Sequence, residues 1–462
     1  MTKLSTPKGM RLHIGILGRR NVGKSSLLNA IVRQQVSLVS EVAGTTTDPV
    51  EKPMELLPLG PVLFIDTAGI DDEGALGELR VKRTTEVFDR IDLGLIVAAG
   101  EWGPFEDALV HEIQARQVPL VVAFNKVDVA PASSVALAAL RERGLCTVET
   151  SAVTGAGLLD LRQALLGQAP ADFLDSRPIV ADLVGPGQIA VLVVPIDKEA
   201  PKGRLILPQV QVLRDLLDHD AFGLVVKERE LRAALDGLRA PPSLVITDSQ
   251  AFLKVAADTP AAVPLTSFSI LFARLKGDLV AQVEGALAIE QLRPGDRVLI
   301  AEACAHHPIG EDIGRVKIPR WLTQYVGGRL DFHTVQGHDF PADLSPYRLI
   351  VHCGSCTMNR REVLGRILRA RAAGVPFTNY GLCIAYSLGI FARALAAFPA
   401  AQDVLSRHEQ TRRNTGQAKA CPRRPGRLAR RRCADGPGPR AGRSLRSQGA
   451  RRRPGGLLSR SV

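Results

Sequence analysis

Cysteines and histidines gather in two short groups in the C-terminal half of the chain, Cys304-x-His306 and His352-Cys353-x-x-Cys356. Two thiolates separated by two residues can face one centre from a tight turn, and Cys304 can join them from a neighbouring strand. Thiolates are soft ligands that favour iron–sulfur clusters and zinc. A fully thiolate-bound [4Fe–4S] cluster needs four cysteines, so three leave one iron for His306, His352 or an exchangeable ligand. A structural Cys3His zinc site built from the same residues is the alternative.

A second group of residues suited to chemistry lies near the N-terminus. Residues 18–25 match the phosphate-loop pattern G-x-x-x-x-G-K-S/T between an expected strand and an expected helix at residues 26–32, the context that supports such a loop. Its glycines let backbone N–H groups wrap phosphates, and the helix N-terminus adds a favourable dipole. We expect Lys24 to reach the β- and γ-phosphates and Ser25 to ligate Mg²⁺. The loop residues assigned to nucleotide binding are Gly18, Asn21, Gly23, Lys24, Ser25 and Ser26.

Two further motifs predict the rest of the metal and phosphate site. Thr46 lies in a glycine-led segment and is expected to close on Mg²⁺ and the γ-phosphate. Asp66 follows an apolar strand and is expected to hold the water shell of the metal, while the N–H of Gly69 binds the γ-phosphate. The predicted catalytic group is therefore Lys24, Thr46, Asp66 and Gly69.

The sequence Asn125-Lys126-Val127-Asp128 predicts which base is bound. A carboxylate at position 128 can accept both the N1–H and the N2–H of guanine, which adenine does not offer. Ser151 and Ala152 complete the predicted base loop. Because all these motifs occur in the expected order, we predict a GTP site.

The group that drives hydrolysis is less evident. Ras-type enzymes position water with a glutamine directly after the glycine of this motif, and this chain has Ile70 there. The segment resembles the GTPases typified by MnmE and Era. In MnmE-like members, an asparagine at the position of Asn21 helps to hold a K⁺ ion that replaces an arginine finger. A loop-capping role for Asn21 is the alternative.

Five apolar runs are expected to form the parallel sheet that positions these motifs, at residues 12–17, 62–65, 93–97, 120–124 and 146–149. The first four end where a polar motif begins, and an open α/β sheet binds its ligand at that edge. The alternation of apolar runs with helical stretches therefore predicts a Ras/Era-like P-loop GTPase domain over residues 8–170.

Two further α/β domains are expected. Residues 178–266 alternate short strands with helices near 210–217 and 228–238, without residues suited to chemistry, and we interpret them as a packing or association module. In residues 267–402, strands at 297–301 and 349–352 would deliver Cys304 and Cys353. Helices are expected at 361–373 and 384–397. Cys383, at the start of a helix, is expected to pack in the core.

The charge of the chain is concentrated at its C-terminal end. The net charge is +12, and residues 409–462 alone carry +14, so the remainder carries −2. The body therefore shows no nucleic-acid footprint. We predict a disordered tail over residues 409–462, because its Arg-, Pro- and Gly-rich composition cannot form a core, and we interpret it as a frameshift product. A genuine basic arm for RNA or acidic partners is the alternative.

The cellular setting follows from the cysteines and the apolar runs. Seven cysteines, three of them near histidines, fit a reducing cytosol and metal ligation better than a disulfide framework. The sequence has no apolar run long enough for a spanning helix. We therefore expect a cytoplasmic protein with no membrane partner.

The two constellations together resemble the HydF family of [FeFe]-hydrogenase maturation GTPases. The similarity includes the cysteine and histidine spacing behind an N-terminal GTPase and extends over about residues 8–400. Further segments that carry it are 44–50 (GTTTDPV), 66–72 (DTAGIDD), 311–319 (EDIGRVKIP) and 379–381 (NYG).

The resemblance implies a function for each domain. The middle module would be a dimerisation domain. Cys304, Cys353 and Cys356 would hold a [4Fe–4S] cluster, with His306 or His352 near its fourth position. The protein would receive a CO- and CN⁻-bearing diiron precursor from the radical-SAM maturases HydE and HydG and deliver it to apo-hydrogenase. GTP hydrolysis would tune the exchange of partners.

A different class of function uses the same motifs. An RNA-directed GTPase, for ribosome assembly or tRNA modification, would combine the nucleotide site with a structural zinc and bind RNA through the basic tail. It predicts salt-sensitive RNA binding and bound zinc. A zinc-using metallochaperone predicts zinc without affinity for RNA.

Overall fold

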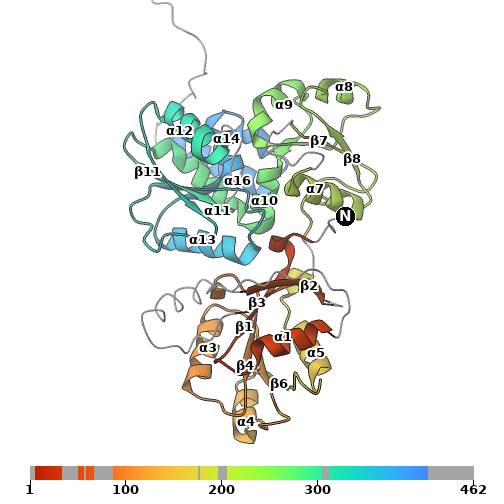
Figure 1. Ribbon diagram of the computed structural model, residues 1–462. Helices are drawn as coiled ribbons and strands as arrows, with labels where there is room; N and C mark the ends of the chain where they lie inside the picture. Colours follow the sequence, from red (N-terminus) through yellow and green to blue (C-terminus); the bar gives the residue numbers. More distant parts are fainter. Residues whose placement is uncertain are drawn as a thin grey trace, which may run out of the picture. The chain divides into compact units, whose positions relative to one another are not determined.

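The computed structural model describes residues 6–33, 50–56, 59–66, 87–174, 177–195, 205–303 and 312–414. In these residues the chain forms three sheets, each flanked by helices (Figure 1). The predicted α/β class is therefore confirmed.

The first sheet contains the five predicted strands and one that was missed. Its order is β2-β3-β1-β4-β5-β6, and all neighbouring strands are parallel except β2 and β3. The missed strand β2 (VEKPMEL) is an edge strand with three charged residues and a proline among its seven residues. This composition breaks the apolar run by which the other strands could be predicted. The bounds are β1 (Leu12–Leu17), β2 (Val50–Leu56), β3 (Gly60–Asp66), β4 (Leu93–Ala98), β5 (Leu120–Phe124) and β6 (Cys146–Glu149).

Helices cover both faces of this sheet, and each face has its own apolar core. Leu28 of α1 and Leu161 of α5 pack on one face, and Val110 of α3 and Leu140 of α4 pack on the other. Burial on both faces explains why β1, β4 and β5 read as continuous apolar runs. The helices are α1 (Lys24–Arg33), α3 (Pro104–Ala115), α4 (Ser134–Glu142), α5 (Leu158–Gly167) and the short α6 (Ala171–Leu174), and a 3-10 turn η1 (Lys8–Met10) precedes β1.

The middle sheet is parallel, with the order β10-β9-β7-β8. Its strand β8 lies at an edge and leaves Phe222 58% exposed and Val225 39% exposed. The short β10 has only three residues, Leu-Thr-Ser, and gives no periodic signal in the sequence. The elements are β7 (Ile189–Val193), β8 (Phe222–Val226), β9 (Leu244–Thr247), β10 (Leu265–Ser267), α7 (Leu207–Asp218), α8 (Leu231–Asp236), α9 (Phe252–Asp258) and the 3-10 turn η2 (Ser249–Ala251).

The third sheet is also parallel, with the order β12-β11-β13-β14. Helix α13 packs on one face, and α10, α11, α12 and α14 contribute to the core on the other. The strands are β11 (Arg297–Glu302), β12 (Asp331–Gln336), β13 (Leu349–His352) and β14 (Phe377–Asn379). The helices are α10 (Phe268–Lys276), α11 (Leu279–Leu287), α12 (Ile318–Val326), α13 (Arg360–Ala372), α14 (Tyr380–Ser387), α15 (Phe391–Ala394) and α16 (Pro399–Asn414), with the 3-10 turn η3 (Ala288–Gln291) and the π-helical turn η4 (Ile313–Lys317).

Two predictions for this region are wrong. The helix expected at 384–397 is two helices, because the backbone turns at Gly389, which has a left-handed φ of 74° and ends α14. Residues 409–414 are helical rather than disordered, since α16 continues to Asn414 and Arg412 pairs with Glu290 at 2.6 Å. The rest of the predicted tail lies outside the described residues.

Helix α10 connects the middle sheet to the third sheet. It begins directly after β10, where the Ser267 hydroxyl accepts a hydrogen bond from the N–H of Ile270. Six of its nine residues are buried, including Phe272 and Lys276. The two sheets share one apolar core across this helix. No helix within the described residues is long and apolar enough to cross a bilayer.

Candidate nucleotide site and candidate thiol site

The phosphate loop follows β1, as predicted, and two of its glycines are required by close approach. Gly18 has a φ of 143°, and an added Cβ would lie 2.2 Å from the carbonyl oxygen of Val97. Gly23 has a φ of 91°, and its Cβ would lie 2.4 Å from Nδ2 of Asn125. A side chain at either position would push the loop away from the sheet and from the base loop.

Lys24 lies buried beneath this loop, with 8% of its surface exposed. Its ammonium donates to the carbonyl oxygens of Gly18 at 2.8 Å and Arg19 at 2.7 Å. The hydroxyl of Ser25 donates to Oδ2 of Asp66 at 2.8 Å. The structure therefore brings the two predicted magnesium-site oxygens together, and these are the hard ligands that Mg²⁺ prefers.

Asn125 ties the base loop to the phosphate loop. Its side chain is 1% exposed, donates to the carbonyl of Val22 at 3.0 Å and accepts from the N–H of Ala152 at 3.1 Å. Lys126 reaches the carbonyl of Asn21 at 2.6 Å. These contacts hold the buried Ser151 segment against the phosphate loop, and Asp128 remains exposed where a base can reach it.

Several predicted nucleotide residues lie outside the described residues, namely Thr46, Gly69 and Ile70. Ser26 is exposed in the first turn of α1. Asn21 is exposed and adopts a left-handed φ of 62°, which asparagine tolerates better than most residues. Its role in holding K⁺ stays a prediction.

The second candidate site is the thiol turn, residues 353–358, which follows β13. The Sγ of Cys353 accepts backbone hydrogen bonds from Ala303 at 3.0 Å and, more weakly, from Ser355 at 3.5 Å. Such N–H···S bonds stabilise thiolates at iron–sulfur sites. Thr357 donates to the carbonyl of Ala303 at 3.0 Å, so the end of β11 is joined to the turn.

The third predicted thiol, Cys304, and His306 lie outside the described residues. In the sequence Cys304 directly follows Ala303, the last described residue before this segment, and the N–H of Ala303 contacts Cys353. Within the described part of the chain, no three His, Cys, Asp or Glu side chains are grouped to hold a metal ion. The described donors, two thiols that are not in disulfides and share a turn with N–H···S bonds, fit an iron–sulfur cluster.

His352 has a protein partner at each ring nitrogen. Its Nε2 accepts from Arg366 at 3.0 Å, and its Nδ1 lies 3.1 Å from the hydroxyl of Ser355. Burial, reinforced by the charge of Arg366, lowers the pKa of His352 to about 3, so the ring is neutral. In this arrangement His352 supports the turn, and ligation of iron would require the loss of one of these contacts.

Buried charges around the turn were not anticipated from the sequence. Arg366 donates to Oε1 of Glu362 at 3.1 Å, and His338 contacts the same oxygen at 2.8 Å. Lys276 reaches the turn from α10, and its hydrogen bonds to described residues all go to backbone carbonyls of the turn. Two signals were present in the sequence: a lysine at the end of a mostly apolar helix, and the i, i+4 pair Glu362/Arg366.

Buried Glu302 joins two of the sequence segments that carried the resemblance. Its carboxylate accepts from Arg315 at 3.3 Å and from Gln336 at 3.1 Å, with Tyr380 at 3.4 Å. An added Cβ on Gly314 would lie 2.0 Å from the Tyr380 oxygen, so only glycine fits there. The segments 311–319 and 379–381 thus meet beside the end of β11, two residues before Cys304.

Cys383 packs in the core, as expected. It is 1% exposed, and burial raises its thiol pKa to about 12. It belongs to the apolar cluster around α14.

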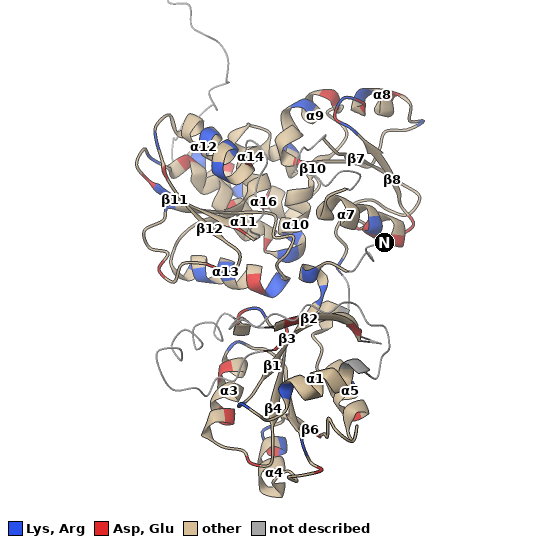
Figure 2. Ribbon diagram, viewed as in Figure 1, with Lys and Arg blue, Asp and Glu red and all other residues tan. Residues whose placement is uncertain are grey.

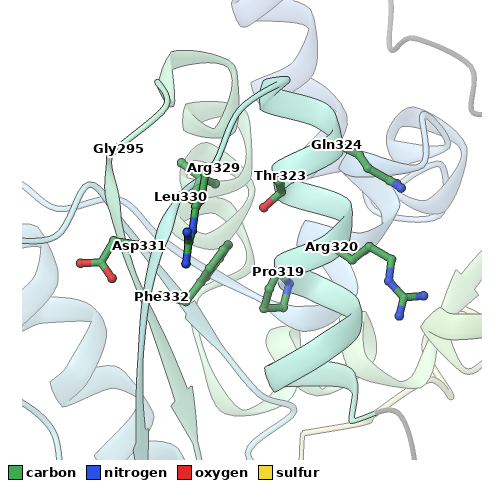
Figure 3. Close-up of a pocket in the computed structure, with 9 residues that line it drawn as sticks. All are labelled: Gly295, Pro319, Arg320, Thr323, Gln324, Arg329, Leu330, Asp331 and Phe332. Carbon is green, nitrogen blue, oxygen red and sulfur yellow. The ribbon is translucent and has the colours of Figure 1, made fainter.

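A cavity of about 770 Å³ lies between α12 and the starts of β11 and β12 (Figure 3). It is at the amino ends of these strands, whereas the thiol turn follows the carboxyl end of β13. A second cavity of about 520 Å³ borders Arg315 and Gln336. The first cavity is lined by Gly295, Pro319, Arg320, Thr323, Gln324, Arg329, Leu330, Asp331 and Phe332, and has no thiol or imidazole.

Basic and acidic residues both occur on the described elements (Figure 2). Helix α8 carries one of each, whereas α13 carries five arginines and one glutamate.

Comparisons with known proteins match three parts of the chain. A 50S ribosome-binding GTPase domain matches residues 13–126, a hydrogen maturase F dimerization domain matches residues 179–277, and a hydrogen maturase F tetramerization domain matches residues 280–397. The dimerization match includes α10 and so extends beyond the predicted boundary at residue 266.

Curated relatives match the first part of the chain. The tRNA modification GTPase MnmE of Desulfotalea psychrophila is 34% identical over 154 residues, 32% of this chain and 33% of that protein. MnmE of Laribacter hongkongensis is 33% identical over 157 residues, 34% of each chain. GTPase Der of Wolinella succinogenes is 36% identical over 123 residues, 26% of each. The chain thus spans about a third or less of these relatives.

Solved structures give weaker likenesses. The G domain of the T. maritima FeoB iron transporter is 23% identical with a TM-score of 0.28, and the match covers 34% of this chain and 98% of that chain. A variant of Aquifex aeolicus Era bound to GDP·AlF4⁻ is 19% identical with a TM-score of 0.30, and the match covers 54% of this chain and 99% of that chain.

The order of the matched domains decides the family. Both hydrogen maturase F domains follow a GTPase domain, and together they extend from residue 179 to residue 397 with a gap of two residues. The chain therefore belongs to the hydrogen maturase F (HydF) family.

Proposed function

We propose that this protein is a GTP-hydrolysing scaffold that carries the CO- and CN⁻-bearing diiron precursor and transfers it to apo [FeFe]-hydrogenase. The observation that carries the proposal is the thiol turn, held by buried charges and N–H···S bonds inside the family's C-terminal domain. A guanine-nucleotide site on the same chain supplies the means to time the transfer.

The nucleotide half of the proposal assigns one task to each group. Lys24 exchanges its loop carbonyls for the β- and γ-phosphates when GTP enters. Ser25 and Thr46 bind Mg²⁺, and Asp66 holds its water shell. Asp128 selects guanine.

Two further assignments concern hydrolysis. The N–H of Gly69 binds the γ-phosphate as charge develops there. Asn21 holds K⁺ beside the phosphates, where the cation offsets negative charge in the transition state. K⁺ therefore stimulates hydrolysis.

The metal half of the proposal places a [4Fe–4S] cluster on Cys304, Cys353 and Cys356. When bound, the cluster supplies an iron with an exchangeable position to which the diiron cargo attaches. His306, two residues after Cys304, is the histidine assigned to the neighbourhood of that position. His352 holds the turn through Ser355, and the protein's own groups keep the thiols together during exchange.

The proposed partners follow from the cargo. HydE and HydG supply the diiron precursor, apo-hydrogenase receives it, and GTP turnover changes the affinity for these partners. Two copies of the chain associate through the middle domain. The exposed side chains of edge strand β8, Phe222 and Val225, support this association.

The test is an anaerobic transfer assay. The reconstituted protein is loaded with the diiron precursor, separated from excess, and mixed with apo-hydrogenase, and hydrogen evolution is measured. The wild-type protein should activate the hydrogenase, and Cys353→Ser should not. A protein that carries zinc, transfers nothing and binds RNA in a salt-sensitive manner would overturn the proposal in favour of an RNA-directed GTPase.

A further inference from the structure

Lys276 is a fully buried cation directly beneath the thiol turn. It is the last residue of α10 and is 2% exposed. Its Nζ donates to the carbonyl oxygens of Ser355 at 2.8 Å, Cys356 at 3.2 Å and Met358 at 2.7 Å. An ammonium group has three protons to donate, so all three are used on one short turn.

These bonds hold the turn in a shape that it would not adopt by itself. Ser355, between the two cysteines, has a left-handed φ of 57°. For a residue other than glycine this conformation is strained and persists only where surrounding contacts impose it. Three carbonyls that converge on one ammonium, with the Ser355 hydroxyl held by His352, are such contacts.

The buried positive charge of Lys276 would be stabilised by a nearby negative charge. No salt bridge between Lys276 and a carboxylate occurs among the described residues, and a buried charge without a counter-charge is costly. Burial lowers the pKa of Lys276 to about 8, and the nearby thiols of Cys356 and Cys353 and the carboxylate of Glu362, which is paired with Arg366, oppose this shift. A metal centre held by the two thiolates would supply the missing negative charge.

We propose that Lys276 is the positioning residue of the thiol turn. Its ammonium gathers the three carbonyls before any metal arrives, and it offsets the charge of the thiolates after the metal has bound. This inference rests on the proposed thiolate metal site and is independent of which metal occupies that site.

The first test uses Co²⁺ alone as the probe, because the thiolate-to-cobalt charge-transfer absorption reports cysteine ligation. Lys276→Met removes the charge and keeps the length of the side chain. It should weaken Co²⁺ binding at least ~10-fold relative to wild type. Lys254→Met removes an exposed lysine of α9 and should bind as wild type does. Equal affinity in all three proteins would overturn the proposal.

A second readout separates charge from folding. In protein reconstituted with iron and sulfide, Lys276→Met should shift the midpoint potential of the cluster to a more negative value, because a nearby cation favours the reduced, more negative state. A role in folding alone would lower the occupancy without moving the potential. If the Lys276→Met molecules that hold a cluster have the wild-type midpoint potential, the proposal that Lys276 offsets the thiolate charge is contradicted.

If Lys276→Met does not fold, hydrogen–deuterium exchange of the wild-type protein tests whether the thiol turn is already ordered without metal. Amides of residues 353–358 should already be protected in the metal-free chain, as in the metal-bound chain. Free exchange until metal is added would overturn the proposal. If instead Co²⁺ binds as expected and no iron–sulfur cluster forms, the proposed function fails and the role of Lys276 stands.

Discussion

Lys24 and Lys276 are two buried lysines that donate to backbone carbonyls, and their surroundings give them different tasks. Lys24 bonds to two carbonyls of a loop whose neighbours Ser25 and Asn21 are exposed, so an incoming phosphate can replace those carbonyls. Lys276 is closed in by apolar residues of α10 and by the turn itself. We therefore propose that the same type of side chain provides an exchangeable contact in one site and a permanent support in the other.

The two sites are prepared for their ligands in different ways. The nucleotide site is built from backbone geometry, with glycines at the points of closest approach. The thiol turn is built from buried charges that hold a strained backbone. We expect the first to respond to changes in side chains that touch the ligand, and the second to changes in groups that never touch it.

The largest expected effect is at the base. Asp128→Ala removes two charge-assisted hydrogen bonds to guanine, each worth about 1.5–3 kcal/mol, so GTP affinity should fall at least ~100-fold. Titration with a fluorescent GTP analogue measures this. Co²⁺ binding at the thiol turn should not change. A variant that still prefers GTP over ATP would break the assignment of Asp128.

The next largest effect is the pH dependence of the free energy of unfolding that comes from Glu362, one of the buried charged residues near the thiol turn. Burial by itself raises the pKa of Glu362, but His338 and Arg366 outweigh it and lower this pKa to about 2. Since the folded-state pKa lies below the unfolded value, this carboxylate stabilises the protein above pH ~4.5. The contribution, about 3 kcal/mol, is lost as the pH falls from ~4.5 to ~2.

Urea unfolding of wild type and Glu362→Gln over this pH range measures the contribution. The difference in unfolding free energy between the two proteins should shrink by about 1.4 kcal/mol per pH unit. A difference that stays constant with pH would show that Glu362 acts only through its shape.

A smaller effect should distinguish the role of Lys24 from that of Lys276. Lys24→Met removes a charged contact to phosphate and should lower Mg·GTP affinity at least ~10-fold, or roughly 1.5–3 kcal/mol. Its nucleotide-free stability should fall by about 1–3 kcal/mol at most, because the two lost hydrogen bonds each contribute about 0.5–1.5 kcal/mol. Isothermal titration calorimetry measures the Mg·GTP affinity, and thermal unfolding measures the stability of the nucleotide-free protein. A large loss of stability would contradict an exchangeable role.

The smallest expected effect is that of the monovalent cation. GTP hydrolysis should be several-fold faster in K⁺ than in Na⁺ at equal ionic strength, a difference of about 1 kcal/mol in the barrier. Asn21→Ala should remove the difference and leave the rate in Na⁺ unchanged. Phosphate release in matched buffers measures both. Equal hydrolysis rates of the wild type in K⁺ and Na⁺ would contradict the K⁺ role of Asn21 and favour the alternative that it caps the loop.

The described part of the nucleotide site could be predicted well because its motifs specify backbone geometry directly. Gly18, Gly23 and Asn125 lie where the motifs require, since the loop cannot approach the sheet and base loop otherwise. The strands that deliver these motifs were predicted within two residues because they are buried on both faces.

The support of the thiol turn could not be predicted in the same way. Lys276 is distant from Cys356 in sequence, and the position of α10 beneath the turn follows from packing between two sheets. His352 has the residue type and spacing of a metal ligand, but Arg366 and Ser355 engage its nitrogens. A spacing rule cannot show which partners the fold places beside an imidazole.

The most direct test of the proposed thiolate cluster is electron paramagnetic resonance of protein reconstituted anaerobically with iron and sulfide and then reduced. Wild type should show the signal of a [4Fe–4S]⁺ cluster, and Cys353→Ala and Cys304→Ala should lose it. Protein that is colourless, silent in the spectrum and bound to one zinc would contradict the assignment.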